Sequence, residues 1–147
     1  LYVNSPDMLR KILYLLILAF IGAGIYMYYQ YNKPHATLGE PNMKVNAASL
    51  VEEFTNSEEN AMIKYVGTAD KMLVTQIEGT ISEIKKEGEQ TIIFLDSGNP
   101  ISSVSCTLDK KEQLSGNYQA GSSIILKGLV TGILGDVIID RCVIVNK

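Results

Sequence analysis

The stretch KMLVTQIEGTISEI, residues 71–84, carries the clearest structural signal in the chain. Apolar or small residues recur in it at every second position, as in a strand with one buried face: Leu73, Thr75, Ile77, Gly79 and Ile81. Gly79 lies in the middle of this face, where the missing side chain lets a strand bulge or coil sharply. Residues 122–134, SSIILKGLVTGIL, repeat the pattern around Gly128. The chain therefore contains two long strands that can bend.

Three further strand patterns complete the set: QTIIFLD (90–96), ISSVSCTL (101–108) and VIIDRCVIV (137–145). Residues 109–121 interrupt the alternation with a short helical or looped insert. Long strands with central glycines can coil around a small barrel and contribute to both of its sheets. We therefore predict a mainly β fold, a five-stranded Greek-key OB-fold barrel. An open antiparallel meander with a packed helix is the alternative.

One helix is expected ahead of the barrel, over residues 47–66. Ser49 and Glu52 form a capping box at its start, and Gly67 ends it. Asn56-Ser57 is the point where it could bend or break. Its apolar residues recur at helical spacing: Leu50, Val51, Phe54, Ala61, Met62 and Tyr65. This helix and the barrel should form one domain, residues 47–147.

An uncharged apolar run, ILYLLILAFIGAGIYMYY, occupies residues 12–29. At helical rise it covers about 27 Å, enough for the hydrocarbon core of a bilayer. We expect a single transmembrane anchor over 12–29, preceded by an N-terminal tail (1–11) and followed by a linker (30–46) that contains Pro34, Gly39 and Pro41. The alternative is a cleaved signal peptide, with the cut near Gly24.

The charged residues indicate how the chain is oriented in the membrane and which class of partner it binds. Arg10 and Lys11 flank the apolar run closely, which favours a cytoplasmic tail and an extracytoplasmic domain, periplasmic in a Gram-negative cell. Residues 34–147 contain ten Lys and Arg against fifteen Asp and Glu, a net charge of −5. An acidic domain repels phosphate backbones, so the charge disfavours nucleic acid as a partner.

The sequence contains no recognisable catalytic motif, such as G-x-S-x-G, a Walker loop, H-E-x-x-H or GxGxxG. The only histidine, His35, falls in the linker, so a serine nucleophile would have no histidine base beside it. Asp96, Asp109, Asp136 and Asp140 fall at strand ends and turns, where aspartate is favoured for turn geometry. We expect no enzyme activity, no cofactor and no metal.

Several segments of the domain also match one known family in order and spacing. NSEENAMIKYVG (56–67) resembles the family's Asn-Glu…Ala…Lys-Tyr run, with Ser57 inserted. The other matching segments are IEGTI (77–81), VSC (104–106), IILKG (124–128) and DVIIDRC (136–142). On these segments, residues 49–145 resemble the bacterial tRNA_anti-like proteins. The resemblance implies an OB fold, often behind a membrane or export segment, and no enzyme chemistry.

The two cysteines, Cys106 and Cys142, should be neighbours, because an OB topology places its third and fifth strands side by side. Strict alternation from Val137 and Ile139 would turn Cys142 outward. A bulge at Asp140-Arg141 would turn it inward again. The pair is then either two buried free thiols or, outside the cytoplasm, a disulfide that could contribute about 4 kcal/mol. Two thiols without histidine or cysteine partners cannot complete a tetrahedral metal shell.

Two functions follow from this organisation. The first is a membrane-tethered interaction module that binds an unknown protein, peptide or small ligand on the barrel face. The alternative is a single-stranded nucleic-acid or tRNA-binding OB domain that faces the cytoplasm, which would need a basic groove and stacking aromatic residues. The candidate binding face combines the basic cluster and the aromatic platform that such a groove would need: Lys85, Lys86, Phe94, Lys110, Lys111, Tyr118 and Lys127.

Overall fold

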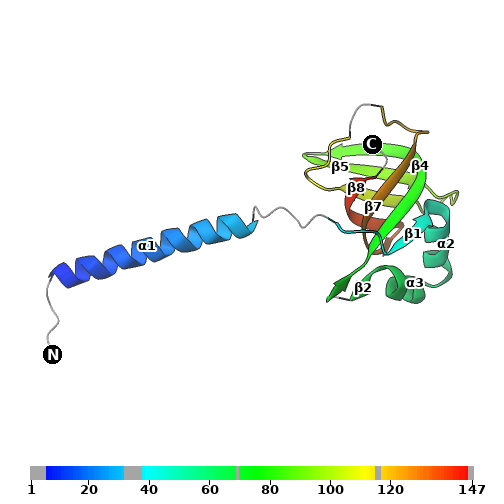
Figure 1. Ribbon diagram of the computed structural model, residues 1–147. Coiled ribbons are helices and arrows are strands. Elements are labelled where there is room, and N and C mark those ends of the chain that lie inside the picture. Colours follow the sequence, from blue (N-terminus) through cyan, green and yellow to red (C-terminus); the bar gives the residue numbers. More distant parts are fainter. Residues whose placement is uncertain (1–5, 32–37, 69, 115–116, 146–147) are drawn as a thin grey trace. The chain divides into compact units, whose positions relative to one another are not determined.

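A computed structural model describes residues 6–31, 38–68, 70–114 and 117–145 (Figure 1). The chain divides into two units, residues 1–37 and 38–147. The first unit contains helix α1 (Pro6–Tyr31), and its 20-residue segment Arg10–Tyr29 is long and apolar enough to cross a membrane. A signal sequence has the same properties. The helix extends beyond both ends of the predicted anchor, residues 12–29.

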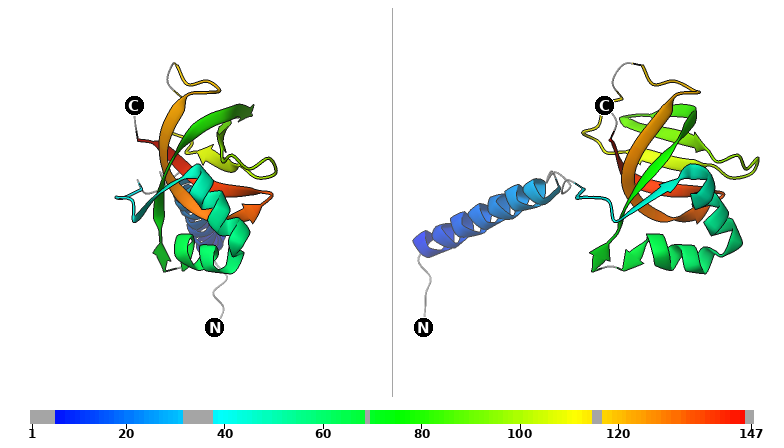
Figure 2. Two further views of the ribbon diagram at one scale, coloured as in Figure 1. Left: turned by 90° about the vertical axis from the view of Figure 1, so that its right-hand side faces the viewer. Right: turned by 45° about the vertical axis from the view of Figure 1, so that its right-hand side comes forward.

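Five strands of the second unit form a closed barrel: β4 (Val74–Glu87), β5 (Gln90–Asp96), β6 (Val104–Leu108), β7 (Ser123–Leu134) and β8 (Asp136–Ile144). Their order is β4-β5-β6-β8-β7, and β7 pairs again with β4 (Figures 1 and 2). All barrel pairs are antiparallel except β6 and β8, which run parallel. This is the predicted OB-fold barrel.

Gly79 lies next to the point where β4 changes its partner strands. Residues up to Thr80 pair with β7, and part of this stretch also pairs with strand β1 (Met43–Asn46), whereas residues from Thr80 onward pair with β5. The register shift in β4 lies between Ile81 and Glu83. A Cβ atom on Gly79 would lie 3.1 Å from the Cβ of Ala47 and 3.3 Å from the Cβ of Leu95. The glycine therefore gives β5 and the start of helix α2 (Ala47–Asn56) room to approach the strand.

The segment before the barrel differs from the prediction in three ways. The leading helix is two helices, α2 and α3 (Glu58–Tyr65), because Ser57 adopts an extended conformation and caps the second one. The first is capped by Asn46, whose side chain accepts a hydrogen bond from Ser49 N–H, so the predicted Ser49 capping box was wrong. A hairpin of β2 (Gly67–Thr68) and β3 (Lys71–Met72) follows α3.

The linker predicted over residues 30–46 also has to be corrected. Helix α1 continues to Tyr31, and residues 43–46 form β1, which pairs in parallel with β4. Asn42, just before β1, adds two hydrogen bonds to β4: its N–H donates to the Val74 carbonyl oxygen, and its side-chain oxygen accepts from Val74 N–H. Residues 32–37, which include His35, lie outside the described residues.

Side chains fill the barrel interior. The core joins inward residues of all five barrel strands to the buried faces of α2 and α3, where the rings of Phe54 and Tyr65 stack with centroids 6.2 Å apart. From the insert between β6 and β7, Leu114 and Tyr118 pack against the same core. The described part of this insert contains turns and no helix.

Candidate binding surface

The outer surface of the barrel is where a ligand could bind, because the interior is packed. On β5, β6 and β8, the residues that alternate with the buried ones face outward and are half-buried. Phe94 pairs with Ser105, which pairs with Ile138, and in the next row Ile92 pairs with Thr107. These five residues form two adjacent rows of apolar and hydroxyl groups, which we call the outer face. OB folds that bind oligonucleotides or oligosaccharides use the corresponding strands.

The β4–β5 hairpin brings two of the predicted binding residues, Lys85 and Phe94, into contact and carries a third, Lys86. Lys85 Nζ lies 4.9 Å from the centroid of the Phe94 ring, within cation–π range. The same ammonium is 3.6 Å from a carboxylate oxygen of Glu83. Lys86 pairs with Thr91 on the neighbouring strand. Lys85 is therefore partly neutralised where it covers the ring.

Lys110 and Lys111 are exposed in the turn that follows β6. The β5–β6 register places this turn toward the end of the sheet that carries the β4–β5 hairpin, since Ile92 pairs with both Lys85 and Thr107. Asp109 lies in the same turn and accepts a hydrogen bond from Lys111 N–H. Cations and carboxylates alternate at this end of the barrel.

Tyr118 and Lys127 are not part of this group. Tyr118 is half-buried against the core, so its ring is not an open stacking platform. Lys127 lies on β7 opposite Gln76 of β4, and its ammonium donates to the carbonyl oxygens of Leu38 and Gly39. Lys127 therefore ties the entering chain to the barrel, a role that sequence reasoning missed.

The cysteines meet in the core as predicted. Cys106 and Cys142 are fully buried on the paired strands β6 and β8, and both are free thiols. The bulge predicted at Asp140-Arg141 is confirmed, because these two residues of β8 lie opposite the single residue Thr107 of β6. Arg141 adopts a left-handed conformation with φ 53°. Burial raises the pKa of the Cys142 thiol well above its ordinary value, and the neighbouring Cys106 thiol adds to this effect. The disulfide stays a prediction.

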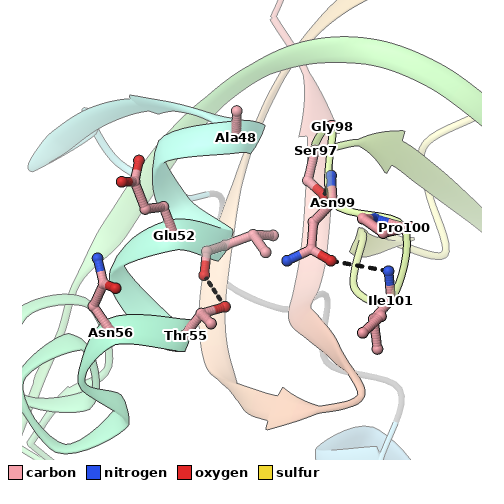
Figure 3. A pocket seen from close by; sticks show the side chains of 10 residues that line it. Ala48, Glu52, Thr55, Asn56, Ser97, Gly98, Asn99, Pro100 and Ile101 are labelled. Atoms are coloured by element: carbon pink, nitrogen blue, oxygen red, sulfur yellow. Dashed lines mark hydrogen bonds between the residues drawn. The ribbon is translucent and has the colours of Figure 1, made fainter.

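An open groove of about 470 Å³ separates α2 from the loop between β5 and β6 (Figure 3). One wall is a stripe along α2: Ala48, Val51, Glu52, Thr55 and Asn56. The other wall is the loop from Ser97 to Ile101. Ile101 is 86% exposed, although the sequence pattern placed it at the start of a strand. The strand begins only at Val104, and residues 97–103 form the loop.

Side-chain hydrogen bonds stiffen this loop from within. Asp96 Oδ1 accepts from Gly98 N–H at 2.8 Å, and Asn99 Oδ1 accepts from Ile101 N–H at 2.9 Å (Figure 3). The Ser97 hydroxyl donates to the Ser102 carbonyl oxygen. Such Asx and Ser turns are locally encoded, and SGNP (97–100) is the sequence signal for them.

A second groove, of about 420 Å³, lies beside β1 and includes a charged cluster from the two helices. Lys64 Nζ donates to Glu53 Oε2 at 2.7 Å, and the Tyr65 hydroxyl donates to Glu53 Oε1 at 3.0 Å. Burial raises the pKa of the Tyr65 phenol, and the hydrogen bond to Glu53 raises the pKa of Lys64. The cluster joins α2 to α3, and its charged groups are paired with one another.

Among the described residues, no group of three or more His, Cys, Asp or Glu side chains could hold a metal ion. The carboxylates at strand ends act in turns, as in the bond from Ser103 N–H to Asp136 Oδ1 at 2.7 Å. Chemically, the described surface offers hydrogen bonds, one covered aromatic ring and exposed aliphatic groups.

These features define an OB-fold domain. The tRNA_anti-like family model matches residues 7–144, so the chain belongs to this family. A solved structure of a proposed nucleic acid-binding lipoprotein from Klebsiella pneumoniae shares the fold at 15% identity with a TM-score of 0.50, covering 70% of this chain and 92% of that one. A chain of the S. pombe Stn1–Ten1 complex is 12% identical with a TM-score of 0.36, covering 50% and 59%. Among curated proteins, none matches.

Proposed function

We propose that this chain is a non-enzymatic, membrane-tethered OB-fold module that binds a protein or peptide outside the cytoplasm. The observation that carries the proposal is the composition of the outer face. Its rows contain Phe94, Ser105 and Ile138 beside Ile92 and Thr107, which are apolar and hydroxyl groups without a line of cations. Single-strand binding would need a positive groove along these strands.

The placement of the lysines supports the same proposal. Of the five predicted binding lysines, Lys127 is used inside the domain, and Lys85 is paired with Glu83. The remaining lysines alternate with carboxylates at one end of the sheet. Helix α1 supplies the tether, and the basic residues at its start favour an extracytoplasmic domain.

Single-stranded nucleic acid is the second candidate ligand. Lys85 above the Phe94 ring is a small version of the stacking and cationic site that such proteins use. The description of the Klebsiella lipoprotein as nucleic acid-binding makes the same test worthwhile.

A binding experiment distinguishes the two functions. It uses the full chain in nanodiscs of zwitterionic lipid. Labelled single-stranded DNA and RNA oligonucleotides are titrated at low and high salt, and we expect no salt-dependent binding. In cells, a photo-reactive amino acid at Phe94 should form protein adducts, whereas the same group at Lys44, exposed on β1, should not. Oligonucleotide binding that weakens with salt and is lost in Phe94→Ala would establish the second candidate instead.

A further inference from the structure

The groove between α2 and the loop of residues 97–101 presents aliphatic side chains to solvent. Ile101 is 86% exposed, and Leu134, the last residue of β7, is 84% exposed. The two turns are joined, because the Ser102 hydroxyl donates to the Gly135 carbonyl oxygen and Ser103 N–H donates to Asp136. Ile101 and Leu134 are thus the chain neighbours of two hydrogen-bonded residues, and we call these joined turns the platform. Ile101 lines the groove, and Leu134 lies outside the groove's lining.

The platform is held in place before any ligand binds. Ile101 has its backbone N–H fixed by Asn99, and Val137 N–H donates to the Ser103 carbonyl oxygen at 2.9 Å. A preformed loop loses little conformational entropy on binding, which favours tight contacts through a small number of side chains. Exposed aliphatic residues on such a loop are typical of protein-binding sites.

The charge around the groove narrows the choice of ligand. Glu52 is the one ionisable residue among those that line it, and it forms no ion pair with the described residues. Asp96 and Asp136 belong to the joined turns. Glu58 and Glu59 begin α3, which is separated from the groove residue Asn56 by Ser57 alone. No Lys or Arg is among the described residues that line the groove.

The combination of exposed aliphatic side chains and carboxylates excludes several classes of ligand for the groove. Phosphate backbones and anionic lipid surfaces would be repelled by the carboxylates. Two copies of the chain meeting at this surface would bring like charges together. A free cation would leave Ile101 and Leu134 exposed to water. A peptide with both aliphatic and basic side chains would cover the exposed Ile101 and Leu134 and would pair with the carboxylates.

We propose that this groove is a second binding site, for an extended peptide segment of a partner protein that carries a basic and an aliphatic side chain. The aliphatic side chain covers Ile101 and Leu134, and the basic one pairs with Glu52. The amides of Asn56 and Asn99, which line opposite walls, supply hydrogen bonds to the peptide backbone (Figure 3). The site involves none of the outer-face residues, so it is independent of the function proposed above.

The test uses the full chain in zwitterionic nanodiscs, with isoleucine methyl groups labelled for NMR. The probe is acetyl-Lys-Leu-Lys-Leu-Lys-amide, and the Ile101 methyl signal should shift during the titration. Ile63 on α3 is the internal control, because it is 71% exposed but does not line the groove, and its signal should stay in place. An analogue with Glu for each Lys should shift neither signal.

Variants then measure each contact. Ile101→Ser should weaken peptide binding roughly tenfold through lost apolar burial, and Glu52→Gln about threefold at low salt, since the ion pair is exposed. Ile63→Ser should leave the affinity unchanged.

Three results would overturn the proposal. The first is equal binding of the acidic analogue, and the second is peptide binding that Ile101→Ser leaves intact. The third is an Ile101 shift without peptide, on raising the protein concentration or on adding anionic lipid, which would identify a second copy or a lipid surface as the occupant.

Discussion

Gly128 lies where β7 passes closest to the bulge of β8. A Cβ atom there would be 2.7 Å from Ile139 Cγ2, 2.9 Å from the Asp140 carbonyl oxygen and 2.9 Å from Cys142 Sγ. Two of these atoms belong to fully buried side chains and one to the backbone, so they cannot move aside cheaply.

Gly128→Ala should therefore lower the free energy of unfolding by about 3 kcal/mol through overpacking. Chemical denaturation of the full chain measures this, with Ser123→Ala on the exposed start of the same strand as the matched control. The control should stay within about 0.5 kcal/mol of wild type. Equal effects of the two substitutions would mean that β7 and β8 are not in close contact at Gly128.

In the reduced protein, Cys142 should make the free energy of unfolding depend on pH in the alkaline range. Its pKa is raised in the folded state, so above the ordinary thiol value of 9.0 the unfolded chain loses a proton that the folded chain keeps. The free energy of unfolding should then fall as pH rises, by at most about 1.4 kcal/mol per unit for this group. Denaturation from pH 8 to 10.5 should show a steeper fall for wild type than for Cys142→Ala. Parallel curves would argue against a buried neutral thiol.

At the scale of elements, β4 depends on the close approach of α2 and β5 at Gly79. Gly79→Val adds strand propensity but places side-chain atoms against Ala47 and Leu95. We expect a loss of about 1–3 kcal/mol in the free energy of unfolding. Thermal melting checks this, with Glu78→Val on the exposed face next to it as the control. A raised melting temperature for Gly79→Val would show that α2 and β5 can move away from the strand.

The elements also show which features sequence can predict. The five barrel strands followed from two-residue periodicity, because this signal is local. The inward turn of Cys142 was predicted only by adding a bulge at Asp140-Arg141, since strict alternation would have turned the side chain outward. Strand β1 was missed, since four residues give too short a pattern and its pairing with β4 is a tertiary contact.

The candidate sites were harder to predict for the same reason. Lys85 and Phe94 are brought together by a hairpin, which sequence shows. The hydrogen bonds from Lys127 to the carbonyl oxygens of Leu38 and Gly39 join residues about ninety positions apart in the sequence. No local sequence pattern encodes such contacts. The groove beside α2 likewise requires knowing where the helix packs.

At the scale of the whole molecule, α1 should hold the protein in the membrane. An apolar helix of this length buries more surface than a peripheral contact, so the full chain should stay with membranes through high-salt and alkaline washes. Fractionation and immunoblotting measure this. A soluble form that begins near Gly24 would show that the apolar segment is a cleaved signal peptide.

Orientation in the membrane sets the redox state of the cysteines. If the barrel lies outside the cytoplasm, Cys106 and Cys142 can be oxidised to a disulfide. Protein taken from its native envelope and denatured without reductant should then contain no titratable thiol, and reduction should release both. Two thiols before reduction would contradict the extracytoplasmic location and favour the nucleic-acid candidate.

The position of β8 between β6 and β7 also constrains how the protein is made. The barrel cannot close until residue 144 has been synthesised, although β4, β5 and β6 are available much earlier. While the ribosome completes the chain, β6 and β7 each present an unpaired edge that can join another chain. Because α1 is made first, it can be captured by the membrane before the barrel folds, which would keep these open intermediates apart. The anchor can thus protect folding in the nascent protein before it serves the mature one.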